Sequence, residues 1–254
     1  MILDQFCLDG QVAMVTGAGQ GLGQAMAVGL AEAGADIIGL DRGECQDTCE
    51  IVQKIGRTFH QIQADLIITE VAVLNSIIQE VVQIFGHLDI LVNNAGIIRR
   101  TAALEFSEKD WDDVLQINLK TVFFLSQAAA RVMIPNGYGK IINIASMLSF
   151  QGGILVPSYT ASKSAVAGIT RSMANEWAKL GINVNAIAPG YMATANTAPI
   201  RADSQRSSTI LERIPAGRWG SPEDLQGITV FLASQASNYL NGAIIPVDGG
   251  WLTR

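Results

Sequence analysis

The sequence predicts an α/β fold of the Rossmann type, in which one domain (residues 1–254) has a doubly wound, seven-stranded parallel sheet with helices on both faces. Two observations predict it. Short apolar segments alternate with helical patterns along the chain, which favours parallel strands joined by right-handed crossovers. Some of these segments, such as Ile90–Val92, are apolar throughout, as expected of strands buried on both faces.

Strands and helices alternate from the N-terminus, and each predicted strand is a short apolar, β-rich run. The predicted strands are Val12–Thr16, Asp36–Asp41, Thr58–Ala64, Leu88–Asn93, Lys140–Ala145, Asn183–Ala188 and Ala243–Val247. Helical patterns lie between them at residues 22–33, 44–56, 69–85, 108–132, 158–179 and 222–233. Ligands of such sheets bind beyond the carboxyl ends of the strands, so polar residues that follow a strand are candidates for the site.

One segment, residues 191–220, does not follow this alternation. It contains a short helical pattern near Ser204–Arg213 and the turn Pro215–Gly217, and it is too long for an ordinary connection between elements. Because it follows a predicted strand end, where ligands bind, we interpret it as a lid over the site. The remaining sequence leaves no room for a second domain.

Composition excludes several classes of protein. Apolar residues make up 49% of the chain and charged residues 16%, which is typical of a globular domain with a sizeable core. A net charge of −6 without basic clusters argues against nucleic acid or an anionic membrane as a partner. No apolar run approaches the ~18 residues of a membrane span, and the N-terminus lacks a basic, cleavable leader. We therefore expect a soluble, cytoplasmic protein.

The cysteines predict no metal site. The chain has three of them, Cys7, Cys45 and Cys49, a sparse and odd number that is typical of reduced thiols in the cytoplasm. Cys45 and Cys49 could share a helix face, but no histidine or third cysteine lies near them in the sequence.

A glycine-rich segment, Thr16–Gly23, follows the first predicted strand and opens the first predicted helix. Glycines let the backbone approach a ligand closely, and a helix N-terminus presents free N–H groups and a positive dipole end to a pyrophosphate. In this strand–loop–helix context the segment predicts a dinucleotide site. A turn that serves only helix–sheet packing is the alternative.

Asp41 ends the second predicted strand, 18 residues after Gly23. A carboxylate there can accept hydrogen bonds from both adenosine ribose hydroxyls and would repel a 2′-phosphate, which favours NAD over NADP. Arg42 follows directly and could receive a phosphate, whereas the uncharged Gln20 provides no second basic anchor.

Polar residues also end the third and fourth predicted strands. Asp65 could bind the adenine amino group, but its position is equally typical of a turn or cap. In Asn93–Gly96, asparagine side chains can tie neighbouring loops to the sheet, while Ala95 and Gly96 let a cofactor lie close. A simple turn is the alternative.

Tyr159 and Lys163 are four residues apart in a helical pattern, so both side chains lie on one helix face. A free tyrosine has a pKa near ~10, and a neighbouring ammonium favours the phenolate and lowers that pKa. The pair therefore predicts an acid–base group that works near neutral pH. A YxxxK pair alone is weak evidence, but here it follows the dinucleotide motifs.

Two further polar residues are candidates for the same site. Ser146 ends the fifth predicted strand, where a neutral hydroxyl can hold a carbonyl or alkoxide oxygen. Asn118 lies in the middle of a predicted helix, an unfavourable position that often marks a local bend or a bound water. We assign His60 and His87 structural or surface roles.

Together these residues resemble the short-chain dehydrogenase/reductase family over essentially the whole chain. The motifs that carry the resemblance are TGxxxGxG at 16–23, Asp41, NNAG at 93–96, Asn118, Ser146, YxxxK at 159–163, Pro189-Gly190 with Thr194, and Asp248–Gly250. They occur in the family's order and spacing, without a departure among these positions.

The resemblance implies a catalytic tetrad of Asn118, Ser146, Tyr159 and Lys163. Tyr159 would be the acid–base group, Ser146 would orient the substrate oxygen, Lys163 would bind the nicotinamide ribose and lower the phenol pKa, and Asn118 would hold a relay water. Motifs and resemblance together predict cofactor contacts from Gly17, Gly19, Gln20, Gly21, Leu22, Gly23, Asp41, Asp65, Leu66, Asn93, Ala95, Gly96, Tyr159, Lys163, Pro189, Gly190, Met192 and Thr194. The resemblance further implies a homotetramer in which helices 108–132 and 158–179 pair between subunits.

A narrower resemblance, carried by segments 98–101, 105–113, 144–153 and 214–220, is to bacterial sugar-acid dehydrogenases of this family. It implies an NAD-linked oxidoreductase in the breakdown of hexuronates from pectin or related polymers. The acid needs a cation, for which Arg99, Arg100, Arg201 and Arg206 are candidates; Ser146, Gln151 and Tyr159 complete the predicted substrate contacts. A polyol or gluconate dehydrogenase, a ketoacyl-carrier reductase and a non-enzymatic nucleotide sensor are the alternatives.

Overall fold

The computed structural model describes all residues 1–254 and has one seven-stranded sheet with the order β3-β2-β1-β4-β5-β6-β7. The strands are β1 (Val12–Thr16), β2 (Asp36–Asp41), β3 (Phe59–Gln63), β4 (Ile90–Asn93), β5 (Gly139–Ile144), β6 (Ile182–Pro189) and β7 (Ile244–Val247). Every neighbouring pair is parallel. The predicted fold class is therefore confirmed, and the seven predicted strands agree with the observed ones to within two residues at either end.

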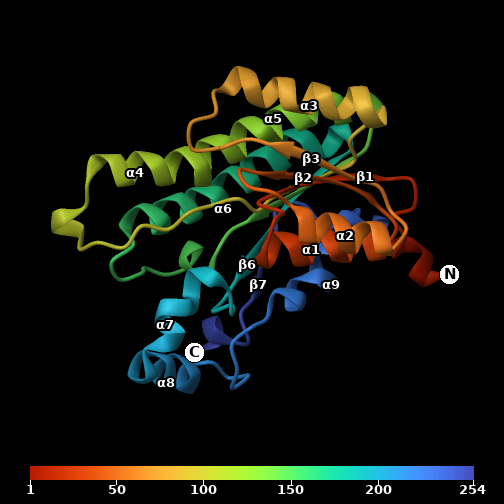
Figure 1. The fold of residues 1–254 in the computed structure, drawn as a ribbon. Helices are drawn as coiled ribbons and strands as arrows, with labels where there is room; N and C mark the ends of the chain where they lie inside the picture. The colour runs from red at the N-terminus through yellow and green to blue at the C-terminus, as the bar shows by residue number, and fades with distance from the viewer.

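Helices cover both faces of the sheet (Figure 1). They are α1 (Gly21–Glu32), α2 (Gln46–Lys54), α3 (Val71–Phe85), α4 (Glu108–Leu115), α5 (Thr121–Met133), α6 (Pro157–Trp177), α7 (Ala198–Ala202), α8 (Ser204–Arg213) and α9 (Gln226–Ala233). Helices α3, α5 and α6 lie over one face, and α1, α2 and α9 lie over the other. The predicted helix 108–132 is α4 and α5 joined by a π-helical segment, Gln116–Lys120.

The sheet separates two apolar clusters. On one face Leu74 and Ile78 of α3 pack with Leu125 of α5 against the strands, and all three are fully or almost fully buried. On the other face Met26 and Leu30 of α1 do the same. Full burial of such a side chain contributes roughly 1.5–3 kcal/mol, so the two layers hold the sheet rigidly between them.

Residues 191–220 form a separate small layer at the carboxyl edge of the sheet, where α7 and α8 project beside the C-terminus (Figure 1). Ile200, Ile210 and Ile214 pack with Trp251 in an apolar cluster of their own. The chain contains no helix that is both long and apolar enough to span a membrane.

Gly23 provides a test of the packing where α1 meets the β1 loop. A Cβ atom at Gly23 would lie 2.0 Å from the Gly17 carbonyl oxygen and 2.5 Å from the Asn94 side-chain nitrogen, and the backbone oxygen cannot move without moving β1. We expect Gly23→Ala to lower the free energy of unfolding by about 1–3 kcal/mol. Gly227→Ala in α9 is the control: no atom lies within 4 Å of its added methyl, so it should stabilise by about 0.4–1 kcal/mol. Thermal unfolding measures both, and equal midpoints for the two variants would contradict the steric argument.

Candidate active site

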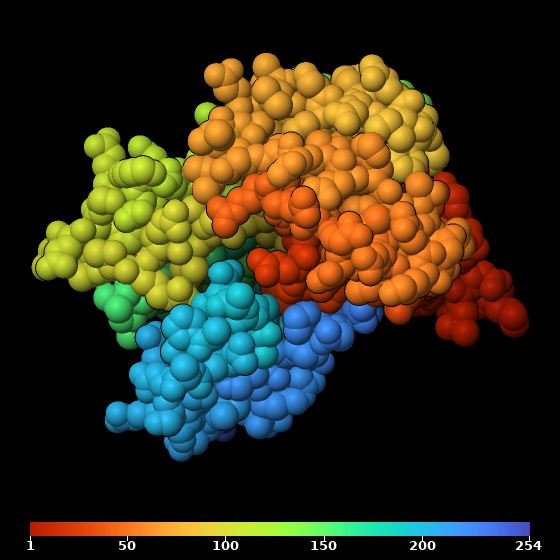
Figure 2. All heavy atoms as spheres, in the orientation of Figure 1, coloured from red at the N-terminus to blue at the C-terminus, as the bar shows by residue number.

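A cavity of about 890 Å³ lies beyond the carboxyl ends of the strands. The sheet order reverses between β1 and β4, so the connections on either side of this point leave in opposite directions and open a crevice. Figure 2 shows the hollow between the lid and the loops of the N-terminal half. Its volume suits a cofactor and a small substrate.

The glycine-rich loop lies at the floor of this cavity. Gly17 and Gly21 have positive φ angles of 68° and 59°, a conformation that side chains disfavour. Helix α1 begins at Gly21, and no side chain caps its N-terminus. The N–H groups of its first turn are therefore free to bind an anion such as a pyrophosphate.

Asp41 connects this loop to the loop after β2. Its Oδ2 accepts a hydrogen bond from the Gly19 N–H (3.0 Å) and its Oδ1 accepts one from the Gly43 N–H (3.1 Å). The carboxylate also lines the cavity together with Arg42. Asp41 thus holds these two loops together and presents its carboxylate to this end of the cavity.

Asp65 and Leu66 line the cavity. The Asp65 Oδ1 accepts the N–H of Ile67 at 3.0 Å, so this side chain also serves the turn role that the sequence left open.

The two asparagines at the end of β4 have different surroundings. Asn93 points beneath the sheet, where its amide nitrogen donates to Ser126 and Asn143 (2.9 Å each), and it does not line the cavity. Asn94, which we did not predict, lines the cavity and donates to the Thr16 carbonyl at 2.8 Å. The alternation of side chains along a strand is the signal that could have distinguished the two residues. Gly19 also lies outside the cavity lining. Its backbone N–H donates to the Asp41 carboxylate, which does line the cavity.

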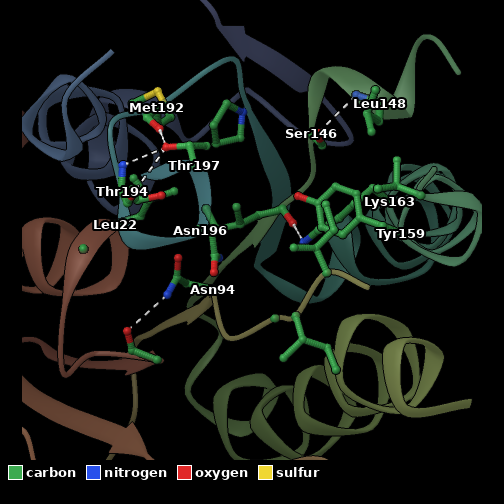
Figure 3. A pocket seen from close by; sticks show the side chains of 18 of the residues that line it. Leu22, Asn94, Ser146, Leu148, Tyr159, Lys163, Met192, Thr194, Asn196 and Thr197 are labelled. Atoms are coloured by element: carbon green, nitrogen blue, oxygen red, sulfur yellow. Dashed lines mark hydrogen bonds between the residues drawn. The ribbon is translucent and has the colours of Figure 1, made fainter. Parts of the chain in front are cut away.

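Ser146, Tyr159 and Lys163 meet on one wall of the cavity, opposite Met192 and Thr194 of the lid segment (Figure 3). Ser146 follows β5, and its Oγ accepts the N–H of Leu148 (3.1 Å), which holds the side chain at the strand end. The Lys163 ammonium lies 5.7 Å from the centre of the Tyr159 ring and donates to the Ile144 carbonyl. The predicted chemistry-bearing side chains of β5 and α6 are therefore in one place.

The pKa values correct one expectation. Burial raises the pKa of the Tyr159 phenol above its ordinary value, and the Ser146 hydroxyl and the Arg100 guanidinium offset this only in part. Burial also lowers the pKa of Lys163 to about 8. The predicted lowering of the phenol pKa by Lys163 is absent here, because burial of the phenol opposes ionisation more strongly than the neighbouring charges favour it.

Asn118 does not reach the cavity. It is fully buried in the π-helical segment between α4 and α5. Its Oδ1 accepts the Ile97 N–H (2.9 Å), and its Nδ2 donates to the Ile97 carbonyl (2.9 Å) and to Ser162 (3.2 Å). These bonds show that the Asn118 side chain positions the loop after β4, and its role in a proton relay stays a prediction.

The segment from Pro189 to Thr194 forms the cavity wall that faces α6. Pro189, Gly190, Met192 and Thr194 all line it. The Thr197 hydroxyl donates to the Met192 carbonyl (2.6 Å) and accepts the Thr194 N–H (3.1 Å), so the turn that carries these residues is held from within the lid.

The predicted substrate residues divide into two groups. Arg99, Arg100, Gln151 and Arg206 line the cavity, whereas Arg201 does not and instead donates to the Thr194 carbonyl (3.1 Å). Three residues that we did not predict also line it: Tyr191, Arg213 and Trp251. They lie on the lid and the C-terminal segment, and only the tertiary structure brings these to the cavity. His60 and His87 lie outside the cavity lining.

The site thus combines a glycine cradle at a free helix N-terminus, a carboxylate at the second strand end, and a phenol beside a buried ammonium. These features fit a nicotinamide dinucleotide, because Gly17, Gly21 and Gly23 line the cavity beside the uncapped start of α1, where no side chain separates the backbone from a ligand. Fold and site define an oxidoreductase that uses such a cofactor and acts on an alcohol or ketone.

Comparison with known proteins identifies the family. A family model described as enoyl-(acyl carrier protein) reductase matches residues 17–252. The chain is 64% identical over 255 residues to a 2-dehydro-3-deoxy-D-gluconate 5-dehydrogenase of Escherichia coli (strain K12), with 100% of both chains covered. This protein belongs to the short-chain dehydrogenase/reductase family.

Solved structures of similar proteins have the same fold. A candidate 2-deoxy-D-gluconate 3-dehydrogenase of Agrobacterium tumefaciens with bound NADP is 53% identical with a TM-score of 0.92, and 99% of this chain and 100% of that chain are covered. A gluconate 5-dehydrogenase of Burkholderia cenocepacia in complex with NADP and tartrate is 40% identical with a TM-score of 0.94, and both chains are fully covered.

The raised pKa of Tyr159 has opposite consequences for the two directions of the reaction. Oxidation needs the phenolate, which the raised pKa makes scarce at neutral pH. We expect kcat/KM for oxidation to rise through pH 7–9, while reduction, which needs the protonated phenol, does not rise in that range. Initial rates in both directions measure this. An oxidation rate independent of pH in this window would contradict it.

Proposed function

We propose that this protein is an NAD-linked dehydrogenase that interconverts a secondary alcohol and a ketone on a sugar acid. The proposed substrate is 2-dehydro-3-deoxy-D-gluconate, a product of hexuronate breakdown from pectin-type polymers. One observation carries the proposal: beyond Lys163, the charged side chains that line the cavity at the lid end are all arginines.

The acidic side chains of the cavity lining lie at one end, and the charged side chains at the lid end are basic. The acidic residues of its lining are Asp41 and Asp65, which follow β2 and β3 at the adenosine end. The lid end has Arg100, Arg206 and Arg213 and no acidic residue in its lining. The chain as a whole has a net charge of −6, so this positive charge is local. It favours a carboxylate-bearing substrate over a neutral polyol.

The relatives support the same substrate class. The E. coli relative is named for 2-dehydro-3-deoxy-D-gluconate, and the structure from B. cenocepacia is described as a gluconate 5-dehydrogenase and contains the dicarboxylate tartrate. Gluconate is therefore the second candidate substrate. An acyl-carrier thioester is disfavoured, because docking of an acidic carrier protein needs a basic face and this chain is acidic.

In the proposed reaction the chain's own residues move a proton. In oxidation the Tyr159 phenolate accepts the proton of the substrate hydroxyl, and in reduction the phenol returns it. The Ser146 hydroxyl holds the reacting oxygen, and the buried Lys163 ammonium provides positive charge behind the phenol. The nicotinamide, when bound, accepts or donates the hydride.

A substrate panel tests the proposal. Absorbance at 340 nm would be followed with 2-dehydro-3-deoxy-D-gluconate, D-gluconate, a neutral polyol and a ketoacyl thioester, each with NAD(H) and NADP(H). We expect the highest kcat/KM with the deoxy sugar acid. Preference for the polyol or the thioester would overturn the substrate, and no turnover of any compound would favour a nucleotide sensor.

Tyr159→Phe removes the proton-transferring hydroxyl and keeps the ring. We expect kcat to fall by roughly 10²–10⁴-fold, while the dissociation constant for NADH, measured by fluorescence titration, changes little. A variant that retained more than about a tenth of the wild-type kcat would exclude Tyr159 as the acid–base group.

The choice of NAD over NADP is also a proposal. It rests on the Asp41 carboxylate, which lines the adenosine end and would repel a 2′-phosphate. Arg42 in the same lining and the NADP bound in the two related structures argue for the phosphorylated cofactor. The loop hydrogen bonds to Asp41 keep the carboxylate in place, so we expect its repulsion to prevail.

Asp41→Asn tests this preference, because it removes the charge and keeps an oxygen that can accept a loop N–H. We expect wild-type kcat/KM to be at least about tenfold higher with NAD than with NADP, and the ratio to fall by roughly tenfold in the variant. Steady-state kinetics with both cofactors measure the ratio. A wild-type enzyme that preferred NADP would refute the assignment.

We further propose a homotetramer in which α4–α5 and α6 pair between subunits. The exposed apolar residues Leu104, Trp111 and Phe150, on or next to these helices, support such pairing. Light scattering of the purified protein measures the assembly, and a monomer would reject it.

A further inference from the structure

The arginines near the lid differ in whether their side chains have partners. Arg99 pairs with Asp110 (Nε to Oδ1, 3.2 Å). Arg100 donates to the Asn196 carbonyl (3.2 Å) and so connects the β4 loop to the lid. Both guanidinium groups therefore already hold parts of the protein together.

Two other arginines of this region are also engaged. The Arg213 guanidinium lies 3.9 Å from the centre of the Trp251 ring, a cation–π arrangement. Arg201 donates to the Thr194 carbonyl and lies outside the cavity lining. Use of Arg201 as a ligand group would require breaking its hydrogen bond to Thr194, and stacking holds the Arg213 guanidinium against the Trp251 ring.

Arg206 is different. It lines the cavity, and its side chain makes no hydrogen bond or salt bridge; the residue's backbone N–H donates to Asp203 Oδ1 at 3.0 Å. Burial raises the pKa of the phenol of Tyr191, another residue of the cavity lining, and the Arg206 charge offsets this in part. A free guanidinium at the lid end of the cavity is suited to a bidentate grip on a carboxylate.

We infer that Arg206 is the residue that binds the carboxylate of the substrate. This inference rests on the proposed sugar-acid function and specifies which cation performs it. Arg100 then has a different role, because its charge acts on the Tyr159 phenol while its side chain holds the lid.

Contacts at both ends of α8 hold the backbone that carries Arg206 in place. It lies in the first turn of α8, which Asp203 caps. At the other end of α8, Ile210 and Ile214 pack against Trp251, and the Arg254 side chain donates to the Glu212 and Arg213 carbonyls (2.8 and 3.3 Å). The C-terminal segment thus fixes the helix that carries the anchor, while the anchor itself remains free for a ligand.

The test compares KM for 2-dehydro-3-deoxy-D-gluconate with KM for its uncharged C1 amide, in the wild-type enzyme and in Arg206→Met. A hydrogen-bonded charge pair predicts that KM for the acid rises roughly tenfold to hundredfold, while KM for the amide and the dissociation constant for NADH stay within about threefold. Arg206→Lys, which keeps the charge without the planar fork, should give an intermediate KM. Arg218→Met is the matched control, because it removes an arginine of the same segment outside the cavity.

The kinetic results distinguish a failure of this inference from a failure of the proposed function. Equal increases in KM for acid and amide, or an unchanged KM for the acid, would overturn the inference while leaving the proposed function intact. So would an acid-specific increase in Arg100→Met or Arg213→Met with none in Arg206→Met. A wild-type enzyme inactive on all sugar acids would overturn the proposed function and this inference together.

Discussion

The hydrogen bonds between Thr16 and the Asn94–Ala95 backbone join the two loops that meet where the sheet order reverses. The Thr16 hydroxyl accepts the N–H groups of Asn94 (2.9 Å) and Ala95 (2.8 Å), and the Asn94 amide donates back to the Thr16 carbonyl. This junction determines the width of the crevice between β1 and β4. These bonds hold together the glycine cradle that follows Thr16 and the loop after β4, both of which line the cavity.

Burial and charge act against each other in the catalytic part of the cavity. A phenol that is to move a proton benefits from a water-poor setting, but the same burial disfavours its ionised form. The structure places Lys163 behind the phenol and Arg100 within electrostatic reach of it. Arg100 also holds the lid through Asn196, so the position of the lid and the electrostatics of the acid–base group are linked through one side chain.

Most of the fold was predictable, because strand–helix alternation and continuous apolar strands leave few alternatives to a doubly wound sheet. The positions and partners of individual side chains were harder to predict. Asn93 and Asn94 are adjacent in a motif that suggests one shared role, yet only Asn94 reaches the cavity, since successive strand residues point to opposite faces. Nothing in the sequence indicated that the Asn118 amide pairs with the Ile97 backbone, a partner 21 residues away.

The sequence by itself determined the fold class, the family, the glycine cradle and the Ser146–Tyr159–Lys163 set, because these depend on local spacing and on the order of motifs along the chain. Only the tertiary structure decided which arginine is free. Arg99, Arg100, Arg201 and Arg206 are equivalent as residue types, and their difference arises from partners contributed by α4 and the lid. The direction of the Tyr159 pKa shift was decided in the same way, since it depends on how much of the surrounding chain excludes water from the phenol.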